Sequence, residues 1–223
     1  LRKTDISAGR SINLALANRG LAALDDLGLK ARVQPLLIPM KGRMLHDLAG
    51  NLEFQSYGRQ PHEVIYSVSR RDLNQLLLDE AEATGRVDIR FNQACTGVDL
   101  ERNALILKDH DSARQYTQAF DTVFGTDGST SVLRESTVNA AAGSVNIAPL
   151  DHSYKELTLP AGSGGEHQID AHSLHIWPRG EFMLIALPNK DGSFTVTLFL
   201  LSKGKELSFE AIQDEAALMA LFN

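Results

Sequence analysis

The chain has 223 residues, 43% of them hydrophobic, so it can bury a core as one large domain or as two smaller ones. Its formal charge of −6 argues against a broad basic face for nucleic acid, and no apolar run is long enough to span a bilayer. The single cysteine, Cys95, excludes an internal disulfide framework and suits a reducing, cytoplasmic compartment.

The first third of the chain predicts short strands and one helix. Residues 11–17, "SINLALA", are apolar enough for a buried strand, and Asn18 is placed to cap a helix over residues 19–27 that ends at Gly28. Further short strands are predicted at residues 36–40, 43–50, 52–58 and 63–68, with Gly50-Asn51 as a hairpin turn.

The clearest helix is predicted over residues 69–85, "SRRDLNQLLLDEAEATG". Ser69 and Asp72 have the spacing of a capping box, and Gly85 supplies the stop. Strands are then predicted at residues 87–91, 104–109 and 120–125.

The pattern changes near residue 150 to β-rich runs separated by glycine-containing turns. Four antiparallel strands in a meander are predicted at residues 154–160, 172–178, 182–188 and 194–200, followed by an amphipathic helix over 208–222. The stretch "NAAAGS" (139–144) reads as a connector. The sequence therefore predicts an α+β protein of two closely joined units, one built on a nucleotide-binding type of sheet.

Three groups of residues are candidates for chemistry. Arg70 lies in the first turn of a helix, where the helix dipole disfavours a cation unless an anion binds nearby; a solvated Arg, or one paired with Asp72, is the alternative. In "GTDGSTSVLR" (125–134), the glycines permit close backbone approach and Asp127 can accept hydrogen bonds, as they would in an ordinary turn.

Arg43 and Tyr57 form the third group, because they flank the Gly50 turn and can face one another across a ladder. A guanidinium fork plus a phenol makes a good carboxylate clamp, although a surface pair fits the spacing equally well. His172 and His175 point to opposite faces of a strand and make a poor metal pair. Trp177 and Cys95 are interpreted as packing residues, while alternating Met183, Ile185 and Leu187 indicate either a core or a pocket floor.

Several stretches in order resemble one family. They are "GRSINLALANRG" (9–20), "IPMKGRMLHDLAG" (38–50), "YSVSRRDLNQLLLDEAE" (66–82), "GTDGSTSVLR", "YKELTLP" (154–160) and "LHIWPRGEFMLIALPNKDGSFTVTLFL" (174–200). From about residue 9 to 202 the series resembles the kynurenine 3-monooxygenases, a family of FAD-dependent aromatic hydroxylases. The Asp-Gly turn is typical of the wider superfamily, whereas "GRSINLAL" and "LHIWPR" are characteristic of the kynurenine enzymes.

The resemblance implies a reaction and a set of site residues. The parent enzyme would hydroxylate L-kynurenine at its 3-position with FAD as cofactor and NADPH and O₂ as co-substrates. Arg43 and Tyr57 would bind the substrate carboxylate. An apolar sheet would face the aromatic ring, formed by Leu174, Met183, Ile185, Leu187 and Phe199. The FAD site would include Ala15, Arg70, Cys95, Asp127 and Gly128. No side chain is assigned as a catalytic acid or base, because the flavin carries the chemistry.

The chain also departs from that family. It has no strand followed by G-x-G-x-x-G for the ADP part of FAD, and no later Gly-Asp segment. We therefore expect an internal portion of a longer enzyme that is inactive alone and binds FAD weakly or not at all. The expected fold is an incomplete α/β FAD-binding domain (residues 1–35 and 62–150) joined to a mostly antiparallel substrate-binding sheet (36–61 and 151–223). A hydroxylase of another aromatic acid and a non-catalytic binding module remain alternatives.

Overall fold

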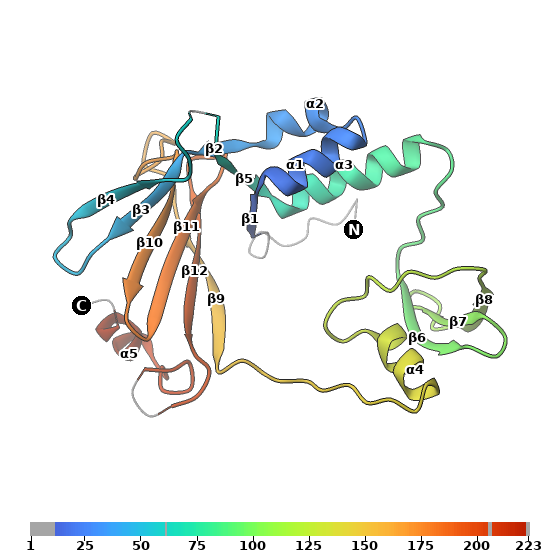
Figure 1. Ribbon diagram of the computed structural model, residues 1–223. Coiled ribbons are helices and arrows are strands. Elements are labelled where there is room, and N and C mark those ends of the chain that lie inside the picture. Colours follow the sequence, from blue (N-terminus) through green and yellow to red (C-terminus); the bar gives the residue numbers. More distant parts are fainter. Residues whose placement is uncertain (1–11, 61, 205–206, 222–223) are drawn as a thin grey trace. The chain divides into compact units, whose positions relative to one another are not determined.

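The computed structural model describes residues 12–60, 62–204 and 207–221, and the chain forms two compact units (Figure 1). Unit 1 takes the chain up to residue 84 and again from residue 150, whereas unit 2 takes residues 85–149. Strands and helices are mixed in both units, which confirms the predicted α+β class. Within the described residues, no helix is long and apolar enough to cross a membrane.

Unit 1 contains a small antiparallel sheet with helices packed against it. Its strand order is β1-β5-β2, from β1 (Asn13–Leu16), β5 (Ile65–Ser69) and β2 (Ile38–Met40). The helical elements are α1 (Asn18–Asp26), α2 (Lys30–Val33), the 3-10 turn η1 (Gln34–Leu36) and α3 (Arg70–Ala83). Their common core is formed by Leu24, Val33, Val68 and Leu73.

The starts of the two long helices differ in how they are capped. At α3 the Ser69 side chain accepts a hydrogen bond from the Asp72 amide at 3.2 Å, as the sequence predicted. At α1 the prediction was wrong, because Asn18 is the first helical residue and not the cap. Ala17 is extended, and its carbonyl already accepts from the amides of Gly20 and Leu21, so the helix begins without a side-chain cap.

The larger sheet of unit 1 has six strands in the order β4-β3-β10-β11-β12-β9. The strands are β3 (Gly42–His46), β4 (Leu52–Ser56), β9 (His152–Leu159), β10 (Ser173–Arg179), β11 (Phe182–Pro188) and β12 (Phe194–Leu201). The predicted meander holds only for β10, β11 and β12. The first strand of the β-rich part, β9, pairs with the last, β12, and β3 joins β10 in parallel.

The six-stranded sheet has two distinct faces, because directly paired residues project to the same side and neighbours alternate. We call one the Arg43 face; its ladder runs through the pairs Arg43–Leu174, Ile176–Ile185, Met183–Phe199 and Phe199–Tyr154. We call the other the His175 face; it carries the buried Phe194, Leu198 and Leu200 together with Trp177. The densest apolar packing of the sheet therefore lies on the His175 face.

Unit 2 is built on a three-stranded antiparallel sheet, β6-β7-β8, with one helix. The elements are β6 (Gln93–Asp99), β7 (Ala104–Asp109), β8 (Gln115–Ala119) and α4 (Val132–Ala140). The strands predicted at 87–91 and 120–125 are absent from the structure, and two of the three real strands, β6 and β8, were not predicted.

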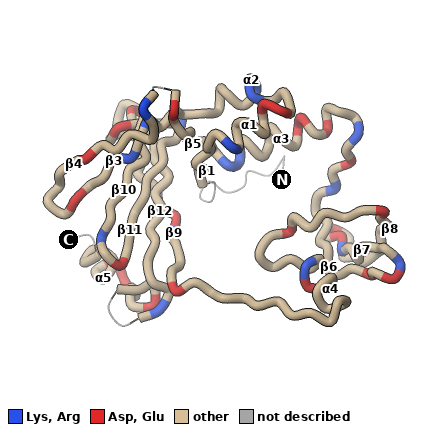
Figure 2. The backbone as a smooth tube through the Cα atoms, viewed as in Figure 1, with Lys and Arg blue, Asp and Glu red and all other residues tan. Residues whose placement is uncertain are grey.

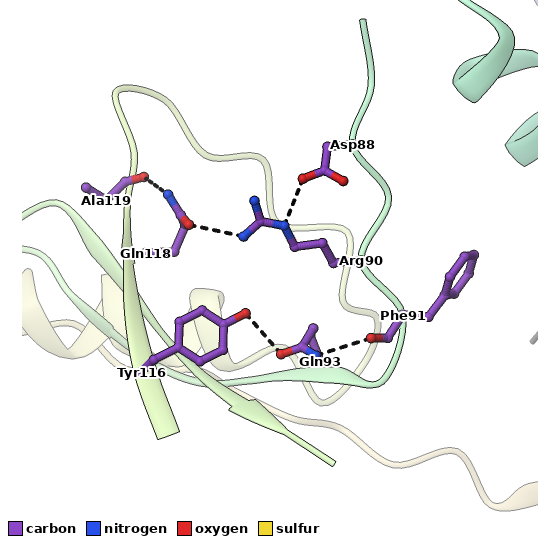
Figure 3. Close-up of polar contacts among 7 residues, drawn as sticks. All are labelled: Asp88, Arg90, Phe91, Gln93, Tyr116, Gln118 and Ala119. Carbon is purple, nitrogen blue, oxygen red and sulfur yellow. Dashed lines mark hydrogen bonds and ion pairs between the residues drawn. The ribbon is translucent and has the colours of Figure 1, made fainter. Parts of the chain in front are cut away.

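Side-chain contacts, rather than a ladder, hold the segment before β6 (Figure 3). Arg90 donates to Asp88 at 2.8 Å and to the Gln118 side chain at 3.3 Å, while Gln93 donates to the Phe91 carbonyl at 3.3 Å. The strand predicted from the apolar alternation of "VDIRF" is therefore wrong, because the backbone of these residues does not pair with another strand.

The final helix is shorter than predicted. It spans α5 (Glu215–Ala220), begins at an Asp214 cap that accepts from the Ala217 amide at 2.8 Å, and follows a turn in which Ser208 accepts from the Ala211 amide. Residues 208–214 are thus not helical and include a turn at 209–211, because Ser208 and Asp214 both offer local side-chain bonds that compete with helix. The predicted end at Phe222 lies outside the described residues.

Candidate functional site

Arg43 and Tyr57 lie together, as their spacing around the Gly50 turn predicted. Arg43 pairs with Gln55 in the β3–β4 ladder, and the Tyr57 amide, just past β4, donates to the Lys41 carbonyl at 3.1 Å. The Arg43 guanidinium carbon lies 5.4 Å from the centre of the Tyr57 ring. This distance is within the range of a cation–π contact, so the two side chains form one cationic and phenolic group at the edge of the sheet.

The Tyr57 hydroxyl is the unusual atom of this pair. It is buried and has no hydrogen-bond partner among the described residues. Burial raises the pKa of the Tyr57 hydroxyl, and the nearby Arg43 guanidinium opposes that rise. Because a buried, unsatisfied hydroxyl costs free energy, this donor is suited to a ligand acceptor that arrives beside Arg43.

The predicted apolar residues share the face that carries Arg43. Leu174 is directly opposite Arg43 in the β3–β10 ladder, and Met183 is opposite Phe199 in β11–β12. Met183 keeps 36% of its surface exposed, whereas Leu187 is only 4% exposed. The exposed part of this face thus lies around Met183, whereas Leu187, further along the same strand, is buried.

Three further residues of this face were not predicted. Ile176 pairs with Ile185, Thr197 pairs with Ile185 from the other side, and Tyr154 pairs with Phe199, with ring centres 6.2 Å apart. Period-two alternation from Leu174 was a signal for Ile176. Tyr154 carried no such signal, because its place beside Phe199 depends on the pairing of β9 with β12.

The Asp-Gly turn of unit 2 is organised by its own carboxylate. Asp127 accepts from the Ser131 hydroxyl at 2.6 Å and from the Val132 amide at 2.9 Å, and these bonds lower the pKa of the Asp127 carboxyl. Arg134 donates to the carbonyls of Gly128 and Ser129. The turn is therefore pre-shaped by bonds within residues 127–134, which leaves its outer side available.

The turn is open at Gly128 and borders a hollow. Gly128 has φ +80°, and a Cβ built there would meet nothing within 4 Å, while Phe124, which lines the hollow, is 84% exposed. A hollow of about 190 Å³ is lined by Cys95, Gly125 and Asp127, so two of the predicted flavin contacts meet here. Since ligand pockets usually enclose roughly 300–1,000 Å³, this hollow can hold only part of a dinucleotide.

The other two predicted FAD contacts belong to unit 1. Ala15 is exposed in β1 and pairs with Ser67, and Arg70 is exposed at the first position of α3, where the helix dipole favours an anion. Arg70 follows the Asn13–Ser69 pair, whereas Ala15 lies further along β1, so both belong to the β1–β5 pair of the small sheet but not to the same end of it. Cys95, Asp127 and Gly128 form a separate group within unit 2.

His172 and His175 lie apart, as predicted. His172, just before the strand, is exposed, and its ring contacts the Pro39 carbonyl at 3.0 Å. His175 is buried, with its Nδ1 2.8 Å from Nε2 of His46. Trp177 stacks on the His46 ring at 4.1 Å, so the expectation that Trp177 serves packing is confirmed.

Comparisons with known proteins show which proteins the chain is similar to. The model of the FAD-binding domain family matches residues 3–200. Kynurenine 3-monooxygenase of Myxococcus xanthus is 46% identical over 100% of the chain and 48% of its own length. The enzyme of the same name from Stenotrophomonas maltophilia is 44% identical over 99% of this chain and 48% of its own length. That of Dictyostelium discoideum is 43% identical over 91% of this chain and 43% of its own length. The chain spans about half the length of the curated relatives it matches.

Solved structures share the fold at low sequence identity. The flavin-dependent monooxygenase PieE, in complex with FAD and substrate, aligns with a TM-score of 0.69 and 15% identity over 95% of this chain and 39% of its own. Klebsiella pneumoniae HpxO with FAD and uric acid aligns at 0.63 and 13% identity over 85% and 47%. The family match over residues 3–200 shows that the chain belongs to the FAD-binding domain family.

Proposed function

We propose that the full-length protein hydroxylates L-kynurenine at the 3-position, using FAD, NADPH and O₂. The observation that carries the proposal is the pairing of Arg43 with the buried Tyr57 hydroxyl, which has no hydrogen-bond partner among the described residues, at the edge of an apolar sheet face. An amino-acid carboxylate satisfies both groups at once, because it accepts from the guanidinium and from the phenol. The curated relatives named kynurenine 3-monooxygenase support this choice of substrate.

The rest of the substrate then lies over the Arg43 face. Leu174, Met183, Ile185 and Phe199 offer apolar surface to the aromatic ring, and the buried Leu187 lies further along β11 on the same face. Packing the ring on this surface excludes water and orients the carbon to be hydroxylated. Arg43 and Tyr57 act in binding and orientation only, since neither is required to move a proton.

FAD fits the residues assigned to it. The open Gly128 turn and the hollow beside Cys95 can contact an edge of a planar ring, and Asp127 keeps the turn in shape. Arg70, at the start of α3, and Ala15, on β1, would contact the cofactor from unit 1. Bound FAD supplies the redox chemistry, in which NADPH furnishes two electrons and O₂ one oxygen atom. Residues 1–35 and 62–150 would serve FAD and residues 36–61 and 151–223 the substrate.

The test replaces the two clamp residues in the full-length protein. Arg43→Ala leaves the substrate carboxylate without its cationic partner and should weaken binding by about 2–5 kcal/mol. Tyr57→Phe removes one hydrogen bond to a charged group and should cost about 1.5–3 kcal/mol. Both losses should appear as a higher KM for L-kynurenine, with FAD content unchanged.

Two controls make the result specific. A kynurenine analogue without the α-carboxylate should react equally well with the Arg43→Ala variant and the parent. Tyr57→Phe should also stabilise the substrate-free protein, by about 1–3 kcal/mol at most, because it deletes a buried unsatisfied hydroxyl. If Arg43→Ala weakens both compounds equally, the substrate is another aromatic compound. If the full-length protein consumes no NADPH with any aromatic acid, a binding module is the better description.

A further inference from the structure

The His175 face of the six-stranded sheet contains a second hollow, of about 660 Å³. It is walled by Trp177, Phe182, Leu184 and Val196 from the sheet, with Leu159 of β9 and Leu221 beyond α5. Trp177 and Leu184 form a directly opposed pair on this face, so the hollow lies on the side away from Arg43. Its volume is within the range of small-molecule pockets.

One cation, Arg179, also lines this hollow. It is the only charged residue in strands β10, β11 and β12, which Figure 2 shows otherwise free of charge. Its guanidinium donates to three carbonyls, those of His46 at 2.9 Å, Pro178 at 2.9 Å and Asp47 at 3.3 Å. These bonds fix the guanidinium in place between the β3–β4 turn and β10.

The fixed guanidinium still has unused capacity. Of its five N–H donors, three are used, and Nε and one N–H of Nη2 have no partner in the part of the chain that the structure describes. No carboxylate forms an ion pair with Arg179 among the described residues. A half-buried positive charge beside an apolar hollow is complemented by an anion, not by a neutral apolar group.

We propose that this hollow binds a small monocarboxylate with an apolar body, such as a medium-chain fatty acid. Its carboxylate would accept from the unused donors of Arg179, and its chain would lie along Trp177, Phe182 and Leu184. The site is separate from the Arg43 face and does not depend on the function proposed above. A further segment of a longer chain seated in the hollow is the competing occupant, and the experiment below distinguishes it.

Trp177 makes the test direct, because it is the only tryptophan of the chain. Octanoate, titrated into the purified 223-residue chain, should change Trp177 emission saturably and should bind more tightly than octan-1-ol. Arg179→Gln should lower the affinity for octanoate at least about tenfold, because hydrogen bonds to a charged group are lost, and leave the affinity for octan-1-ol nearly unchanged. Arg102→Gln, which alters an exposed arginine of unit 2, is the matched control and should change neither.

A second variant covers the case in which Arg179→Gln fails to fold. Val196→Phe fills the hollow and keeps Arg179, so it should abolish the octanoate response with an unchanged circular dichroism spectrum. If Arg179→Gln weakens the binding of octanoate and octan-1-ol equally, the proposal is wrong. It is also wrong if Arg43→Gln weakens octanoate binding, because the ligand would then lie on the Arg43 face. Calorimetry on the full-length protein completes the test, since no octanoate binding there would mean that further chain occupies the hollow.

Discussion

At the scale of single residues, the contact between His46 and His175 determines the protonation of both rings. His175 Nε2 lies 2.7 Å from the Asp170 carbonyl, which can only accept, so this nitrogen carries the proton. Nδ1 of His175 is then the acceptor for the proton on His46 Nε2, 2.8 Å away. A second proton on His175 would face the His46 N–H, so the pair is stable when His175 is neutral.

This pair makes the stability of unit 1 depend on pH. Burial lowers the pKa of both His46 and His175, and Arg179 lowers that of His46 further, so the unfolded chain binds protons more tightly. Stability should therefore be complete above the ordinary histidine pKa of about 6.5 and fall as the pH drops below it. Urea midpoints, followed by Trp177 emission at pH 7.5 and 5.5, measure the loss.

The matched variants are His46→Gln and His110→Gln. The first should reduce the difference between the two midpoints, and the second, a change in the exposed β7–β8 connection of unit 2, should not. An unchanged difference in His46→Gln would mean that other groups titrate in this window. Carboxyl groups with a lowered pKa, such as Asp127, affect stability only at a lower pH than this window, because their ordinary pKa is 3.8.

At the scale of elements, the turn of the β7–β8 hairpin has many side-chain hydrogen bonds but also contains one strained residue. The Asp109 carboxylate accepts from the Gln93 side chain at 2.7 Å and from the amides of Asp111 and Ser112, which lowers the pKa of Asp109 to about 2. Ala113, in the same turn, has φ +56°, a conformation that glycine adopts without the steric cost of a Cβ.

Replacing alanine by glycine should therefore change the stability of unit 2 in opposite directions at two positions of this hairpin. Ala113→Gly should stabilise unit 2 by up to about 1 kcal/mol, because it relieves the left-handed strain. Ala119→Gly, in strand β8, should destabilise it by about 0.5–1 kcal/mol, because it only adds freedom to the unfolded chain. Hydrogen exchange of the β7 amides measures the change in stability in both variants. A loss of protection in Ala113→Gly would contradict the expected relief of strain at this turn.

At the scale of the whole chain, the predicted FAD contacts are divided between two units. Unit 2 offers a hollow of about 190 Å³, too small for the whole cofactor, and the sequence has no G-x-G-x-x-G loop for the ADP part. The chain carries opposite charges interspersed along both units, with no concentrated basic segment for the pyrophosphate (Figure 2).

The 223-residue chain should therefore bind FAD weakly. The missing loop would supply several charge-assisted contacts, each worth roughly 1.5–3 kcal/mol. Titration followed by flavin fluorescence measures the affinity, with Arg70→Ala as the variant that tests unit 1 and Asp127→Asn as the one that tests unit 2. A dissociation constant below micromolar for the parent chain would contradict the expected weak binding. Equal affinity for FAD in both variants and the parent would contradict the assignment of Arg70 and Asp127 to the FAD site.

The sequence by itself determined the features that depend on neighbouring residues. The α3 helix begins at Ser69 because the cap and its amide partner are three residues apart, and Gly28, Gly50 and Gly85 adopt positive φ where turns were predicted. Alternation placed Met183, Ile185 and Leu187 on one side of a strand. The ordered motifs pointed to the FAD-binding family, which the family match confirms, and the spacing around Gly50 predicted that Arg43 and Tyr57 lie together.

Only the tertiary structure decided which distant segments lie side by side. Strand β3 pairs in parallel with β10, about 130 residues later, and this pairing puts Arg43 beside Leu174 and His46 against His175. The same cause explains the failures at 87–91 and 120–125, where apolar alternation was present but no strand offered a ladder. A strand is completed by hydrogen bonds to another part of the chain, and local residue patterns do not specify which part that is.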